Sequence, residues 1–136
     1  MRKKIFFGIG ILLCCLIGWG VYTTFKPHRN VSGEETAASR SATELYHDFE
    51  QHEALANKEW VGKIIEVSGI ISSVNESGNY ISIYLEGSTD GGINCSVLKK
   101  DLETGEKFQP GDTVTIKGRC SGFLMDVNLV DCIIKK

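Results

Sequence analysis

The sequence lacks every motif that would place a reaction at a recognisable kind of site. It has no GxSxG nucleophile elbow and no glycine-rich phosphate loop. It also has no CxxC or HxxxH spacing, so its five cysteines and three histidines form no metal-binding pattern. We therefore expect no catalytic residue, no metal and no cofactor, and we expect that the chain is not an enzyme.

Acidic residues are absent from residues 1–30, which carry five bases and a net charge of +5. The other 106 residues hold all 17 acids against ten bases, a net charge of −7. Proteins that bind nucleic acid draw most of their affinity from Lys and Arg side chains that neutralise phosphates. Basic pairs such as Lys99–Lys100 are typical of a solvated surface. The charge balance therefore disfavours nucleic acid as a partner.

One long segment, residues 5–25, contains no charge at all. A helix of this length spans about 30 Å, the thickness of the hydrocarbon core of a bilayer. The basic residues at positions 2–4 favour the cytoplasmic side, and Trp19 and Tyr22 suit the opposite headgroup boundary. The pattern predicts a cytoplasmic tail at 1–4 and a single-pass transmembrane anchor at 5–25, with the C-terminal domain outside the cytoplasmic membrane of a bacterium.

A cleaved signal peptide is the alternative for this segment. Signal peptides have an apolar region of about 7 to 15 residues and end at small residues of the A-x-A type. The run here is longer, and no such site follows it closely. We therefore favour an anchor, or a signal that stays uncleaved.

The next segments predict a tether and then a helix. Residues 26–40 have almost no large apolar side chain, which indicates a flexible tether. Ser41 and Glu44 have the spacing of a capping box, so a helix is expected over 42–57. Its apolar face is expected to contain Leu45, Phe49, His52 and Ala56.

From Gly62 onward the apolar residues recur with a period of two, which is typical of strands. Five strands are expected, near residues 63–74, 80–85, 93–97, 113–118 and 123–134. The one long connection, 99–109, joins the third strand to the fourth. The pattern predicts a mainly β fold: a five-stranded OB-fold Greek-key barrel over 41–136, preceded by one helix. A β-sandwich would need more strands.

Four stretches of the chain resemble a bacterial OB-fold family, the tRNA_anti-like family, named for its likeness to the anticodon-binding domain of tRNA-charging enzymes. They are ELYHDFEQHEALANKEWVGK from Glu44, VSG at 67–69, GDTVTIKG at 111–118 and CSGFLMDVNLVDC at 120–132. His52 and Trp60 stand where the family often has Asn and Tyr. The resemblance implies the fold and a frequent association with an export signal or membrane anchor, but no established activity.

The strand expected at 80–85 has two faces, either of which could be exposed. One face would offer Tyr80, Ser82 and Tyr84, and the other Ile81, Ile83 and Leu85. OB barrels commonly bind through the outer face of the second and third strands, and exposed aromatic rings two residues apart can stack on bases or sugars. We therefore take Tyr80, Ser82 and Tyr84 as the candidate ligand-binding residues.

Three cysteines lie beyond the apolar segment, at positions 95, 120 and 132. An odd number in an oxidising compartment suggests one disulfide and one free thiol. The third and fifth strands of an OB barrel are neighbours, so Cys95 with Cys132 is the preferred pair. Cys120 with Cys132 stays open as a second pairing, and so do three reduced thiols packed in the core.

These features favour a non-catalytic, membrane-anchored binding module of the bacterial cell envelope. Its partner besides the membrane would be an envelope protein, a glycan or a small ligand. A domain that binds single-stranded nucleic acid is one alternative, and an accessory domain of an envelope enzyme or transport assembly is another.

Overall fold

The computed structural model describes residues 2–24 and 30–135, with side chains for residues 8–20 and 30–135. Helix α1 (Arg2–Thr24) occupies most of the predicted anchor. Met1 of the predicted tail, Phe25 of the anchor, residues 26–29 of the tether and Lys136 lie outside the described residues. Within the described part of the chain, no helix is long and apolar enough to cross a membrane. The anchor stays a prediction.

Helix α2 (Ala42–Trp60) begins with the expected capping box. The backbone N–H of Glu44 donates to the Ser41 hydroxyl and the N–H of Ser41 donates to the Glu44 carboxylate, both at 3.2 Å. These bonds satisfy donors that a helix start leaves unpaired. They also lower the pKa of Glu44, chiefly through the backbone hydrogen bond at Ser41.

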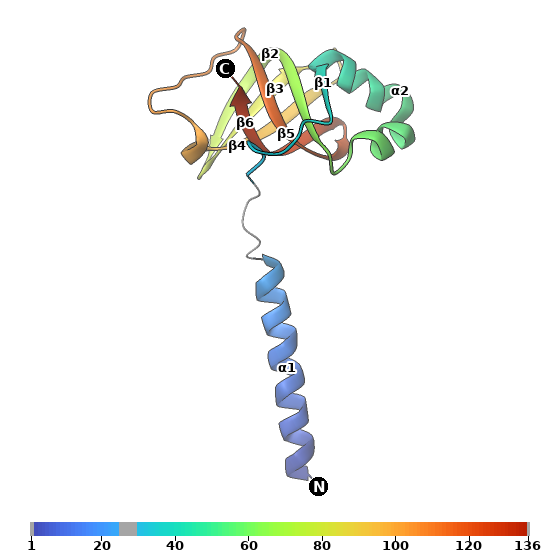
Figure 1. The fold of residues 1–136 in the computed structure, drawn as a ribbon, viewed down its shortest axis with the longest axis vertical. Helices are drawn as coiled ribbons and strands as arrows, with labels where there is room; N and C mark the ends of the chain where they lie inside the picture. The colour runs from blue at the N-terminus through green and yellow to red at the C-terminus, as the bar shows by residue number, and fades with distance from the viewer. Residues whose placement is uncertain (1, 25–29, 136) are drawn as a thin grey trace.

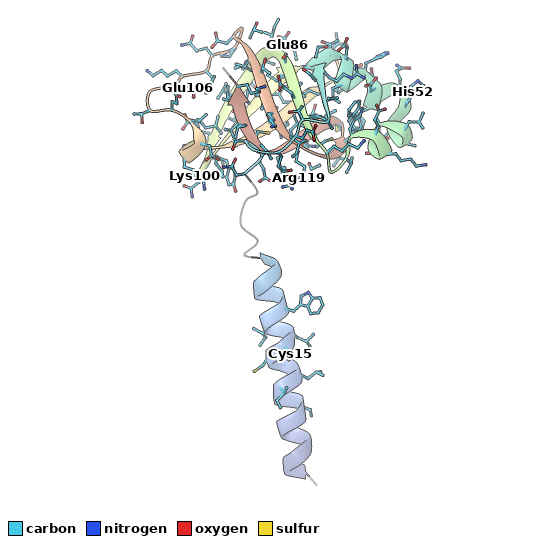
Figure 2. The ribbon with its side chains drawn as sticks, in the orientation of Figure 1. Cys15, His52, Glu86, Lys100, Glu106 and Arg119 are labelled. Carbon is cyan, nitrogen blue, oxygen red and sulfur yellow. The ribbon has the colours of Figure 1, made fainter. Side chains whose placement is uncertain are left out.

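The second half of α2 differs from the prediction. The helix continues to Trp60 rather than ending near Asn57, and His52 has non-helical backbone angles (φ −141°, ψ 55°). His52 is exposed, so its expected place on the packed face was wrong; Figure 2 shows it on the side of α2 that points away from the barrel. Beyond the kink, Ala56 and Trp60 are both buried.

Five strands close into a barrel: β2 (Ile64–Ser77), β3 (Tyr80–Glu86), β4 (Gly92–Leu98), β5 (Thr113–Leu124) and β6 (Asp126–Lys135). They pair in the order β2–β3–β4–β6–β5, and β5 returns to β2. Only β4 and β6 run parallel within this ring, so the third and fifth barrel strands are neighbours as expected. The five-stranded OB-type barrel is confirmed (Figure 1).

The predicted tether is shorter than expected. Strand β1 (Ala38–Ser41) pairs in parallel with residues 65–68 of β2. Upstream of it, Val31 is fully buried, and the buried amine of Lys117 donates to the backbone carbonyl of Glu34. Residues 30–41 are therefore part of the folded domain, because they bury apolar surface and satisfy backbone groups that a tether would leave to water.

Helix α2 packs against one end of the barrel and contacts all six strands (Figure 1). Close packing requires a glycine at position 69, because a Cβ there would lie 2.8 Å from Cβ of Ala42. The irregularity in β2 lies between Ile71 and Ser73. The extra residue there bends the strand so that it can pair first with β5 and then with β3. The core inside the barrel is formed by the alternate apolar residues of all five strands.

Candidate functional site

The burial of alternate residues in β3 shows which of its two faces lies on the outside of the barrel. Ile81, Ile83 and Leu85 point into the core. Tyr80, Ser82 and Tyr84 alternate with them and are half-buried on the outer face. The structure therefore places the three sequence-predicted residues together on the outside of the barrel.

Cross-strand pairing extends this outer face to β4 and β6. Ser82 lies opposite Ser96, and Tyr84 lies opposite Asn94. Asn94 in turn lies opposite Asn128, and its side-chain amide donates to Oδ1 of Asn128 at 3.3 Å. We call this surface the polar face; its members are Tyr80, Ser82, Tyr84, Asn94, Ser96 and Asn128. None of them is charged.

One end of the polar face is fixed by the carboxylate of Asp126, the first residue of β6. The Tyr84 hydroxyl donates to Oδ1 of Asp126, and the backbone N–H of Gly92 donates to the same oxygen at 3.0 Å. Burial, together with the Asp126 carboxylate that accepts this bond, raises the pKa of Tyr84 to about 12. Tyr84 is thus a neutral hydrogen-bonded residue over the physiological range, with a ring held in one orientation.

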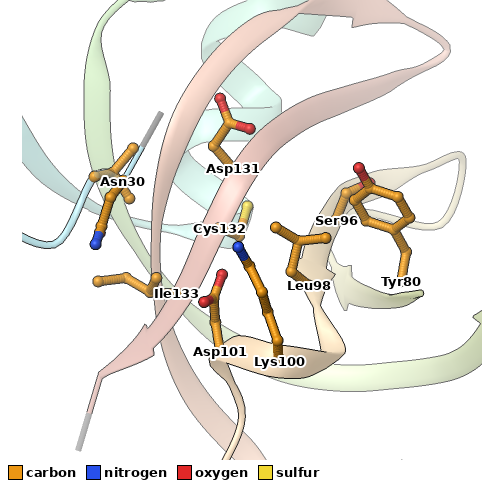
Figure 3. Close-up of a pocket in the computed structure, with 10 residues that line it drawn as sticks. Asn30, Tyr80, Ser96, Leu98, Lys100, Asp101, Asp131, Cys132 and Ile133 are labelled. Carbon is orange, nitrogen blue, oxygen red and sulfur yellow. The ribbon is translucent and has the colours of Figure 1, made fainter. Parts of the chain in front are cut away.

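The other end of the polar face is hollow. A space of about 430 Å³ lies against Asn79, Tyr80, Leu98, Lys99 and Lys100. A smaller pocket of about 70 Å³ adjoins it and shares Tyr80, Leu98 and Lys100 with it. Figure 3 shows Tyr80 on one side of this pocket and Asn30 on the other. Residues far apart in sequence therefore converge at the start of β3.

Charges around the small pocket are of both signs. Lys100 and Asp101 line it from the short helix η1 (Lys99–Asp101) that follows β4. Asp131 lines it from β6 and pairs with the guanidinium of Arg119. Asp131 has a left-handed backbone (φ 54°), which is uncommon for a residue other than glycine and often occurs at functional sites. The pocket is polar without a strong net charge.

The three domain cysteines are all buried, and the structure contains them as free thiols. Cys95 and Cys132 are in contact across β4 and β6, and this contact together with burial raises the pKa of Cys95 well above its usual range. Cys120 lies elsewhere in the core, and burial raises its pKa to about 11. The structure therefore brings together the pair preferred from the sequence, and the disulfide itself stays a prediction.

The remaining polar candidates do not assemble into a site. Among the described residues, no three His, Cys, Asp or Glu side chains lie close enough to hold a metal ion. Trp60 is buried, its ring lies 5.4 Å from the Arg40 guanidinium, and its Nε1 has no hydrogen-bond partner in the described part of the chain. This indole is far along α2, outside the polar face.

Sequence comparison gives the family. The chain matches the tRNA_anti-like family over residues 1–134. It belongs to that family. A tRNA_anti-like domain is an OB-fold binding domain and is typically non-catalytic. No curated protein matches this chain.

Several solved structures are similar to this tRNA_anti-like domain, and one of them supports its fold. A proposed nucleic acid-binding lipoprotein from Klebsiella pneumoniae matches with a TM-score of 0.57 and 19% identity, over 71% of this chain and 91% of that one. The S. pombe Stn1–Ten1 complex matches with a TM-score of 0.40 and 17% identity, over 49% and 52% of the two chains. A proposed aspartyl-tRNA synthetase from Leishmania major matches with a TM-score of 0.48 and 11% identity, over 79% of this chain and 21% of that one. At 19% identity the likeness to the Klebsiella structure establishes the fold alone.

Sequence reasoning missed half of the tRNA_anti-like domain's polar face. Asn94, Ser96 and Asn128 were visible only as the polar members of alternating strands. The position of Asn128 beside Asn94 depends on the parallel pairing of β4 with β6, which joins residues over 30 positions apart. The alternation could have pointed to these residues, but their grouping could not be read from local sequence.

Proposed function

We propose that this chain is a non-catalytic binding module of the bacterial cell envelope, held at the membrane by its N-terminal segment, and that its ligand lies on the polar face. The observation that carries the proposal is the orientation of β3. Its apolar residues fill the core, while Tyr80 and Tyr84 stand on the outer surface with a hollow beside Tyr80. The outer face of these strands is the surface that OB barrels use for ligands.

The proposed location rests on the N-terminal sequence. Residues 5–25 are uncharged, and three bases precede them. This arrangement favours insertion with the N-terminus in the cytoplasm and the binding domain outside it. A domain placed there would meet the components of the cell envelope.

Nucleic acid binding is the competing proposal, because it is the property named for the Klebsiella lipoprotein that shares the fold. Two features of this chain weigh against it. Residues 31–136 carry a net charge of −7, and none of the six side chains of the polar face is basic. Such a surface gains little from the release of counterions from phosphates. We expect only weak binding of single-stranded DNA or RNA at physiological salt.

The test compares capture of envelope material by three versions of the full-length chain in a mild detergent. Tyr80→Ala removes a ring of the polar face, and Leu55→Ala removes an exposed apolar side chain of α2 as the matched control. We expect Tyr80→Ala to lose a captured component that both the unchanged chain and Leu55→Ala retain. Equal capture by all three would contradict the proposal, provided that urea unfolding shows both variants to be folded.

A further inference from the structure

The polar face has an unusual chemical makeup for a binding surface of its size. Its six side chains provide hydroxyls, carboxamides and two phenol rings, and no charge. A phosphate backbone would need a row of cations. None of the six side chains is basic, and of the two lysines that line the hollow beside Tyr80, Lys99 is paired with Glu76 at 2.8 Å. A peptide that binds by strand addition would need a free sheet edge, yet β3 and β4 each have a partner strand on both sides. Neither linear polymer suits this surface.

The hydrogen-bonding groups of the face suit hydroxyl and amide partners instead. Ser82 and Ser96 lie side by side at the centre. The Asn94 amide nitrogen and the Asn128 amide nitrogen both donate within the protein, to Asn128 Oδ1 and to the carbonyl of Asp126 respectively. The Asn94 side-chain oxygen accepts no hydrogen bond from any described residue. The network thus leaves the oxygen of the half-buried Asn94 side chain as an acceptor for a ligand hydroxyl or amide N–H.

The hollow end supplies space for a ring. A volume of about 430 Å³ beside Tyr80 and Leu98 falls in the range of small-molecule sites. The adjoining 70 Å³ pocket is large enough for a substituent but too small for a second ring. Lys100 and Asp101 line it with opposite charges, and Asp131 there is balanced by Arg119. The pocket therefore selects a polar group with no net charge.

We propose that the polar face binds an uncharged glycan strand that carries N-acetyl groups. One sugar ring stacks on Tyr80 in the hollow with a substituent in the small pocket, and the next sugars lie over Ser82, Ser96 and Asn94 toward Tyr84. The inference rests on the proposed function, which assigns the ligand to this face, and adds the chemical class of the ligand. The aromatic ring provides stacking, and the serines and asparagines pair with sugar hydroxyls and acetamido groups.

The test is calorimetric titration of the full-length chain, in detergent, with a β-1,4-linked N-acetylglucosamine tetramer. We expect binding that is the same at low and high salt, because an uncharged ligand gains nothing from counterion release. Tyr80→Ala should weaken it by about tenfold, the scale of one lost ring stack, whereas Tyr80→Phe should retain it. Ser96→Val should weaken binding too, and Ser39→Val, on the exposed surface of β1, should leave it unchanged.

The outcomes separate this inference from the proposed function. If the tetramer fails to bind, or binds Tyr80→Ala and the unchanged chain equally, the glycan assignment is overturned. The proposed function still stands if Tyr80→Ala loses capture of envelope material, and it fails if capture is unchanged. Tight binding of oligothymidylate that weakens steeply with salt would overturn both the glycan assignment and the charge argument.

Discussion

The hydrogen bond between Tyr84 and Asp126 should contribute measurably to the stability of the polar face. Tyr84→Phe removes the hydroxyl that donates to Asp126 but leaves the ring and the bond from Gly92 in place. Hydrogen bonds to charged groups contribute about 1.5–3 kcal/mol, and partial exposure places this one at the lower end. We expect the free energy of unfolding to fall by about 1.5 kcal/mol, measured by urea denaturation of the full-length chain.

Coupling between the two residues distinguishes this bond from a simple loss of packing. Asp126→Ala removes both bonds to the carboxylate and should cost more than Tyr84→Phe, because the Gly92 N–H loses its acceptor. When Tyr84→Phe is added to Asp126→Ala, the free energy of unfolding should fall only slightly further. Additive effects of the two substitutions would refute the reasoning, since residues joined by a hydrogen bond are expected to be non-additive.

The same bond predicts a pH dependence at high pH. The pKa of Tyr84 is raised to about 12 in the folded protein, against an ordinary value of 10. Below pH 10 the Tyr84 phenol is protonated in both the folded and the unfolded chain, so its contribution to the free energy of unfolding is fully present. This contribution is lost as pH rises from 10 through about 12, because the phenol ionises first in the unfolded chain. Asp126→Asn should lower this pKa only part of the way, since burial is the larger cause. The pKa of Tyr84 is measured from the absorbance of its phenolate.

Three further predictions concern other parts of the chain. Gly92→Ala should lower the free energy of unfolding by about 3 kcal/mol, because its Cβ would lie 2.1 Å from a backbone carbonyl oxygen, whereas Gly33→Ala, with open space around it, should change little in urea denaturation. Protein taken from the periplasmic side should contain a Cys95–Cys132 bridge and leave three of the five cysteines free to label after denaturation; five labelled thiols would defeat the pairing. Full-length protein should stay in the membrane fraction after carbonate washing, and release of a soluble domain that begins after residue 30 would contradict the anchor.

The barrel could be predicted from the sequence because apolar residues recur with a period of two, most regularly in β3. Alternate positions of β3 hold the apolar residues Ile81, Ile83 and Leu85, and the structure places all three in the core. The capping box at Ser41 also marks its helix start by local chemistry alone. Such signals need no knowledge of the rest of the fold.

Features set by distant contacts could not be predicted. Strand β1 consists of Ala38–Ser41, which has no apolar alternation, and it forms because β2 offers it an edge. The kink at His52 lies inside a continuous helical pattern, and no residue of that pattern marks it. Asp131, which lines the small pocket, has a left-handed backbone, and nothing in the flanking residues marks it.

The central claim is that the ligand lies on the polar face, and a crosslink formed in cells tests it most directly. A photoreactive benzoylphenylalanine can replace Ser82 at the centre of the face or Glu53 on the exposed side of α2. The account predicts a crosslinked product from position 82 and none from position 53. A product from position 53 alone, or from neither position in folded protein, would contradict it.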